Sequence, residues 1–219
     1  MKEKTKFVAF STQKGGAGKT TLLNILYGEI HPSQGQIRYQ GRELTSCQLY
    51  QAGAYILQSS HVFDDLSVEE NIALGQEIDQ QRMDNILQET GLLSLKGKVP
   101  SNQTLSGGEK QRISIARAIL KDAPIVVLDE ATAYADPENE HQIQKAFDGL
   151  IKNKTVIMVA HRLSTVQDAD QILVMKNGAI AESGTHSDLI KHQGEYAKMW
   201  DNYNKTVQWH IESLSLIHI

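Results

Sequence analysis

The chain has 219 residues, a net charge of -4 and a single cysteine, Cys47. This length suits one α/β domain with a substantial core, and the acidic balance gives no electrostatic case for binding nucleic acid. One cysteine excludes an intrachain disulfide and a cysteine-rich metal site. Because no apolar run approaches the roughly 20 residues that span a bilayer, we expect any role at a membrane to come through a partner chain.

A glycine-rich loop follows an apolar strand predicted at residues 7–10 and precedes a helix predicted at Thr20–Tyr27. Glycine lets backbone N–H groups converge on an anion without Cβ clashes, and the helix start adds unpaired N–H groups and the positive end of its dipole. Strand, loop and helix together indicate a phosphate-binding loop. The residues expected to bind the phosphates are Lys14, Gly15, Gly16, Ala17, Gly18, Lys19, Thr20 and Thr21.

Three side chains of this loop have distinct expected roles. Lys19 reaches the β- and γ-phosphates and so assists catalysis, and the Thr20 hydroxyl holds Mg²⁺. We therefore expect the chain to use a nucleoside triphosphate with Mg²⁺. Lys14 leaves two alternatives open, and we prefer a solvated or same-site phosphate contact over a contact with the nucleotide of a second copy.

The middle of the chain combines a strand with a mainly helical region. The strand is predicted at residues 53–57, and helical signals dominate residues 63–97. Within that region Ser67 and Glu70 have the spacing of a capping box, which predicts a helix start. A second helix is expected over Gln80–Thr90, with Met83, Ile86 and Leu87 facing inward.

A second glycine pair opens another helix, which we expect to reach Leu120. The segment reads Leu105-Ser-Gly-Gly-Glu-Lys-Gln111, and we call it the signature segment. Ser106 and Glu109 again have capping-box spacing, which places Ser106 at the helix N-terminus. This helix start also suits an anion, yet the first glycine loop already supplies one phosphate cradle.

Two apolar strands end in polar residues. Residues 125–128 are apolar on both faces, as a buried parallel strand should be, and lead into Asp129 and Glu130. Asp129 suits Mg²⁺ binding through water, and Glu130 suits the role of general base for the attacking water. The second strand, residues 155–160, ends at His161. The alternatives are carboxylates that only cap a turn and an ordinary loop histidine.

The remaining elements complete a predicted α/β fold. Residues 36–39 alternate like an exposed strand, Asp136-Pro137 starts a helix, and Asn177-Gly178 predicts a hairpin between strands 171–175 and 179–182. Strands that alternate with helices predict a wound, largely parallel sheet with a helical subdomain and a C-terminal hairpin. Ligands of such sheets bind at the carboxyl ends of the strands.

The signature segment, Leu128-Asp-Glu-Ala-Thr132 and the later His161 together resemble the nucleotide-binding domain of exporter-type ABC transporters, a P-loop NTPase fold. The resemblance implies that ATP and Mg²⁺ bind, that Gln58 contacts Mg²⁺ or the attacking water, and that His161 contacts the γ-phosphate. It implies a head-to-tail dimer, homomeric or heteromeric, in which the signature segment closes on the partner's nucleotide. The residues expected at that interface are Ser106, Gly107, Gly108 and Asp136.

The same resemblance gives an expected domain organisation and cellular role. We expect one ABC-type domain over residues 1–211, with a helical subdomain inserted at about 62–121, and a frayed tail over 212–219. Such a subunit hydrolyses ATP to power a separately encoded membrane transporter, in the cytoplasm at the inner face of the cell membrane. No nucleic acid partner is expected.

Residues 5–22 depart from this pattern and resemble ParA/MinD partitioning ATPases instead. Gln13 stands where the usual loop has glycine, and Lys14 adds a second lysine. Only six residues precede Phe7, so no aromatic residue is available there to stack on adenine, and the helical region lacks the usual acidic-glycine loop before the signature segment. We expect weaker ATP affinity and poorer base selectivity, unless another aromatic residue substitutes. The alternative functions are a ParA/MinD-like dimerising switch and a nucleotide-binding module with impaired turnover.

Overall fold

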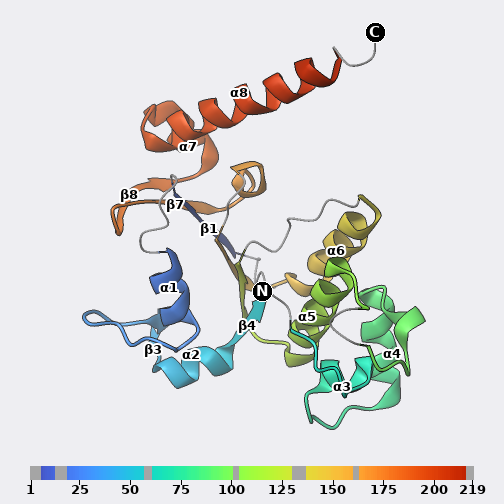
Figure 1. The fold of residues 1–219 in the computed structure, drawn as a ribbon. Helices are drawn as coiled ribbons and strands as arrows, with labels where there is room; N and C mark the ends of the chain where they lie inside the picture. The colour runs from blue at the N-terminus through green and yellow to red at the C-terminus, as the bar shows by residue number, and fades with distance from the viewer. Residues whose placement is uncertain are drawn as a thin grey trace. The chain divides into compact units, whose positions relative to one another are not determined.

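The computed structural model describes residues 6–12, 19–56, 61–100, 104–129, 137–159 and 163–215. Its main sheet has six strands in the order β4-β5-β6-β1-β7-β8 (Figure 1). The pairs β4–β5 and β1–β7 are parallel, and β7–β8 is antiparallel, so the predicted sheet with its C-terminal hairpin is confirmed. The strands are β1 (Lys6–Thr12), β4 (Gly53–Ile56), β5 (Ile125–Asp129), β6 (Thr155–Val159), β7 (Gln171–Lys176) and β8 (Ala179–Gly184).

Helices connect these strands. A small hairpin, whose two strands β2 (Arg38–Tyr39) and β3 (Arg42–Glu43) have two residues each, also lies between them in the sequence. The α-helices are α1 (Lys19–Leu26), α2 (Ser46–Ala52), α3 (Val68–Ala73), α4 (Gln80–Glu89), α5 (Gly107–Lys121), α6 (Pro137–Leu150), α7 (His186–His192) and α8 (Glu195–Ser215). Two short 3₁₀ helices, η1 (Leu93–Leu95) and η2 (Leu163–Val166), complete the described elements. The predicted strand at 36–39 is therefore half as long as expected and belongs to the small hairpin.

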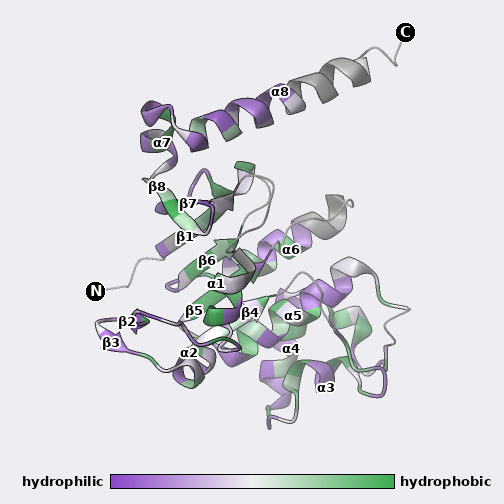
Figure 2. Cartoon of the chain, turned by 60° about the vertical axis from the view of Figure 1, so that its left-hand side comes forward, coloured by the Kyte–Doolittle hydropathy of each residue, from purple (hydrophilic) through white to green (hydrophobic). Residues whose placement is uncertain are grey.

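The described chain divides into two compact units, one built mainly from residues 25–157 and the other from 7–24 and 158–219. In the first unit, β5 is almost fully buried, and its hydrophobic residues stand out in the hydropathy colouring (Figure 2). Buried parallel strands are apolar on both faces because helices cover both sides of the sheet. The sequence pattern of residues 125–128 follows from that burial.

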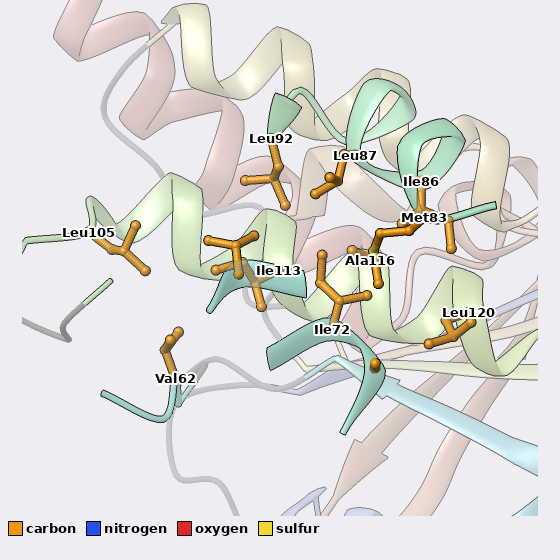
Figure 3. Close-up of a cluster of buried hydrophobic side chains, with 12 residues drawn as sticks. Val62, Ile72, Met83, Ile86, Leu87, Leu92, Leu105, Ile113, Ala116 and Leu120 are labelled. Carbon is orange, nitrogen blue, oxygen red and sulfur yellow. The ribbon is translucent and has the colours of Figure 1, made fainter. Parts of the chain in front are cut away.

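A hydrophobic cluster within the first unit joins α3, α4 and α5 (Figure 3). Met83, Ile86 and Leu87 of α4 are at most 3% exposed, as the helical spacing predicts, and pack against Ile113 and Ala116 of α5. The remaining members also come from one stretch of chain and are Val62, Val68, Ile72, Ala73, Leu92, Leu105 and Leu120. Residues 62–120 therefore form a hydrophobic core of their own.

In the second unit, β7 and β8 turn at Asn177 (φ 52°) and Gly178 (φ 78°). A two-residue hairpin of this type needs positive φ at both positions, which is why Asn-Gly predicts it. Strand β8 then supports α8, because the Glu182 carboxylate accepts hydrogen bonds from the backbone N–H groups of Glu195 (2.5 Å) and Tyr196 (3.1 Å). These bonds satisfy N–H groups that have no partner inside the helix.

Helix α8 continues to Ser215, past the boundary that we expected at residue 211. The sequence from Glu195 to Ser215 holds neither glycine nor proline, so nothing in it stops a helix that has begun. Its first turns pack Tyr196, Met199 and Trp200 against the core of the second unit. Residues 216–219 of the expected tail lie outside the described residues.

Candidate nucleotide-binding site

Helix α1 begins at Lys19, directly after the glycine loop. Lys19 and Thr20 thus occupy the first helical turn, where N–H groups have no partner within the helix and face any bound anion. Leu23 is 5% exposed and holds this helix to the core. Both residues lie at the start of the helix that follows strand β1, and their contacts with phosphate and Mg²⁺ stay predictions.

The signature segment forms the N-terminus of α5, as predicted. The Ser106 hydroxyl accepts a hydrogen bond from the backbone N–H of Glu109 (3.2 Å), and the Glu109 carboxylate accepts one from the backbone N–H of Ser106 (2.8 Å). This is the complete capping box. Ser106 and Gly107 are exposed, whereas Gly108 is buried. An exposed helix start of this kind is accessible to a second molecule.

Asp129 is the last residue of β5 and is half-buried. It lies in the first unit together with the signature segment, whereas Lys19, Thr20 and Thr21 lie in the second. The other predicted site residues lie outside the described residues, so their roles stay predictions. They are Lys14, Gly15, Gly16, Ala17, Gly18, Gln58, Glu130, Asp136 and His161.

The donor chemistry at the end of β5 suits Mg²⁺. Within the described part of the chain, no group of three or more His, Cys, Asp or Glu side chains could hold a metal ion. Mg²⁺ does not need such a group, since proteins usually bind it through one or two carboxylates together with substrate phosphates. One half-buried carboxylate at a strand end, Asp129, matches that requirement.

None of the described helices is long and apolar enough to serve as a membrane span.

A cavity of about 440 Å³ in the first unit was not foreseen from the sequence. Lys121 donates from Nζ to the backbone oxygen of Tyr50 (2.9 Å) and lies 4.7 Å from the centre of the Tyr50 ring, a cation–π contact. Burial lowers the pKa of Lys121. The charged and aromatic residues that line the cavity are Tyr27, Glu29, Tyr50, Tyr55, Arg117 and Lys121. No local motif marks them, because they come from distant parts of the chain.

Two of these tyrosines differ in how their hydroxyl groups are satisfied. The Tyr27 hydroxyl is buried and has no hydrogen-bond partner among the described residues. The Tyr55 ring lies edge-on to the Tyr27 ring, with 4.8 Å between the two ring centres. The Tyr55 hydroxyl is within hydrogen-bonding distance of the backbone oxygens of Leu26 (2.7 Å) and Leu49 (3.1 Å). Burial, and secondly the charge of Asp129, raises the pKa of Tyr27, while burial raises the pKa of Tyr55 to about 12.

Replacing Tyr27 by Phe is therefore expected to raise the free energy of unfolding by about 1 kcal/mol, because a buried hydroxyl without a partner costs its desolvation energy. Tyr55→Phe is the matched control and should lower it by about 1 kcal/mol, since it removes a satisfied hydroxyl. Urea denaturation of both variants measures the difference. Loss of stability in Tyr27→Phe would mean that the hydroxyl has a partner outside the described residues.

Comparison with known proteins decides the family. The family model described as "ABC transporter" matches residues 14–133, which is more than half of the chain. The chain belongs to the ABC transporter family. It carries the ATP-binding and ATP-hydrolysing domain of such a transporter, a P-loop NTPase, as the resemblance of the signature segment implied. The family match begins at Lys14 and so includes most of the glycine loop.

Two kinds of ABC transporter illustrate the similarity. The mycobactin import ATP-binding/permease protein IrtA of Mycolicibacterium thermoresistibile is 40% identical over 199 residues, which is 85% of this chain and 22% of that protein. An ATP-dependent lipid A-core flippase of a Polaromonas species is 40% identical over 196 residues, 84% of this chain and 33% of the flippase. The chain thus spans between a fifth and a third of the length of these relatives.

A solved structure agrees with this relationship. The structure of a bacterial Atm1-family ABC exporter with ATP bound matches with a TM-score of 0.78 and 33% sequence identity. The match covers 91% of this chain and 37% of the exporter chain. Nucleotide-binding domains of ABC transporters are normally paired with a second such domain and with transmembrane domains.

Proposed function

We propose that this ABC domain hydrolyses Mg-ATP in a head-to-tail dimer and thereby powers a membrane transporter supplied as a separate chain. The observation that carries the dimer is the exposed start of α5, where Ser106 and Gly107 present a helix N-terminus to solvent. Such an end attracts phosphate oxygens through its unpaired N–H groups and its dipole. The partner's nucleotide supplies those oxygens, while the glycine loop of each copy holds its own.

In this proposal each predicted residue has one task. Lys19 binds the β- and γ-phosphates, and Thr20 and Asp129 hold Mg²⁺, which neutralises charge on the phosphates. Glu130 accepts a proton from the attacking water. Gln58 contacts Mg²⁺ or the attacking water, His161 contacts the γ-phosphate, and Asp136 lies at the dimer interface. The glycine-loop residues and Thr21 surround the phosphates, with Lys14 solvated or in contact with the same nucleotide.

Membership of the ABC transporter family supports a transporter partner for this chain. The relatives named above are described as an ATP-binding/permease protein, a flippase and an exporter, and we propose that the present chain acts on a comparable membrane-spanning partner at the cytoplasmic face of the membrane. An immunoblot of native cells that detects this sequence only within a much larger polypeptide would contradict the separate chain. The transported substrate is a property of that partner.

Dimer-dependent hydrolysis predicts that the ATPase rate per chain rises with protein concentration and then levels off as dimers saturate. Two chains are needed for each composite site, so dilution below the dimer dissociation constant removes activity. Initial rates over a dilution series, with sedimentation velocity in parallel, test this. A rate per chain that stays constant through the concentration range in which only monomers sediment would overturn the dimeric site.

A further inference from the structure

The cavity of about 440 Å³ in the first unit has two positive charges on one wall. Arg117 and Lys121 are four positions apart in α5, so their side chains lie on the same face of the helix, with about 5–6 Å between their Cβ atoms. Lys121 is exposed and Arg117 is half-buried. A small molecule that enters the cavity therefore meets two cationic side chains that come from neighbouring turns of one helix.

Neither cation is paired with a carboxylate in the part of the chain that the structure describes. Arg117 donates from Nε to the backbone oxygen of Asn71 (2.7 Å), from Nη1 to that of His61 (2.8 Å) and from Nη2 to the Asn71 side-chain oxygen (3.2 Å). Lys121 donates to the backbone oxygen of Tyr50 (2.9 Å). A guanidinium has five N–H donors and an ammonium has three. Both side chains therefore keep donors that these bonds do not use.

The local electrostatics favour an anion beside these two side chains. Burial lowers the pKa of Arg117 and of Lys121, because each cation loses hydration that only neutral oxygens replace. Hydrogen bonds from a cation to an anion are about twice as strong as neutral ones, so a bound anion offsets that loss. Glu29 also lines the cavity, but it is exposed, and solvent and salt screen its charge.

Aromatic and apolar side chains make up much of the remaining wall. The Tyr50 and Tyr55 rings are stacked, with 5.7 Å between their centres and 13° between their planes. Tyr50 is 56% exposed, and Leu74, another lining residue, is 50% exposed. Exposed apolar groups around a hollow are typical of ligand sites, and small-molecule pockets have volumes of about 300–1,000 Å³. The size and lining of this cavity therefore suit a small ring-containing molecule.

We propose that this cavity binds a small aromatic carboxylate, with the carboxylate on Arg117 and Lys121 and the ring against the tyrosines. Donors one helical turn apart can each bond one carboxylate oxygen, and aromatic rings pair favourably in offset or edge-to-face arrangements. None of the described residues that line the cavity belongs to the predicted nucleotide site. The inference therefore goes beyond the proposed function and does not depend on ATP hydrolysis.

The test uses 2-naphthoate, whose fluorescence reports binding, and 2-naphthamide, an uncharged molecule of nearly the same shape. Naphthoate should bind the full chain with a submillimolar Kd, and naphthamide should bind about tenfold more weakly or less well still, because a neutral amide forms no charge-assisted pair. Lys121→Met, which removes the charge but keeps an unbranched side chain, should weaken naphthoate binding about tenfold. Lys121→Arg should bind naphthoate nearly as well as wild type.

Lys96→Met is the matched control, since Lys96 is an exposed lysine of the same unit that pairs with Asp84 (2.6 Å) away from the cavity. Its Kd for naphthoate should equal that of wild type. Glu29→Gln should instead tighten binding, because it removes a like charge from the cavity wall, and it serves as the second variant if Lys121→Met does not fold. In methyl NMR spectra, naphthoate should shift the signals of Leu74 and Ala118, which line the cavity.

Equal Kd values for naphthoate and naphthamide would overturn the proposal, since the cavity would then accept any apolar surface. The same conclusion follows if millimolar naphthoate leaves the Leu74 and Ala118 methyl signals in place. An unchanged Kd in both Lys121→Met and Glu29→Gln would also overturn it, because the charges of the cavity wall would then play no part in binding.

Discussion

Glu130→Gln is expected to lower the ATPase rate by about 10²–10⁴-fold, the range that a positioned general base contributes, while Mg-ATP binding is retained. Glutamine has nearly the same shape as glutamate but cannot accept the proton of the attacking water. ATP should therefore remain bound, and the dimer should persist. Initial rates, calorimetric ATP titration and size-exclusion chromatography in Mg-ATP measure the three quantities.

Glu70→Gln is the matched control for this experiment. Glu70 is an exposed carboxylate that completes the capping box of α3 with Ser67, and a glutamine oxygen can accept the same backbone hydrogen bond. Its rate should equal that of wild type. If Glu130→Gln also keeps the wild-type rate, Asp129 and Glu130 are carboxylates that cap the turn after β5, and the general base must be sought elsewhere.

Lys19→Ala is expected to weaken ATP binding by about 10- to 100-fold, because hydrogen bonds to charged groups are worth about 1.5–3 kcal/mol. Hydrolysis should fall with it, since the same ammonium group stabilises charge on the transferred phosphate. Equilibrium titration with a fluorescent ATP analogue gives the affinity. Lys14→Ala serves as the comparison within the same loop.

Lys14→Ala should leave hydrolysis unchanged if Lys14 is solvated, whereas a contact with the phosphates of its own copy would show as a smaller loss of ATP affinity than in Lys19→Ala. Dimers that form with wild-type Lys14 and disappear in Lys14→Ala would favour the ParA/MinD-like alternative, in which this lysine reaches the partner's nucleotide. Equal losses in both lysine variants would instead show that the loop needs its total positive charge. These outcomes are distinguishable because dimerisation and affinity are measured separately.

Two helix starts were predictable from a local signal in the sequence. Ser67 with Glu70 and Ser106 with Glu109 form the capping boxes that their spacing indicates. Helix α2 begins with the same device, since Thr45 and Gln48 bond reciprocally, but its seven residues carry too little apolar periodicity to be recognised. Short helices of this kind depend on tertiary packing, here through buried Leu49, more than on their own sequence.

Contacts between distant residues were not predictable. Arg117 binds His61 across 56 positions, and Lys121 binds Tyr50 across 71. Neither pair belongs to a motif, and a partly buried arginine in a helix has the same local sequence whether or not it meets an acceptor. The candidate site residues could be proposed because phosphate and Mg²⁺ chemistry demand particular residue types at strand ends and helix starts. The side chains that hold those elements in register follow no such demand.

The two outer strands of the sheet bear on how copies of this chain can associate. Strands at a sheet border offer unpaired N–H and C=O groups on which another chain can add. Here β4 is only four residues long, and the β7–β8 ladder is interrupted between Val174 and Met175. Short and irregular borders make poor templates for strand addition. The protein is therefore less prone to form fibrous aggregates by strand addition at these two edges of the sheet.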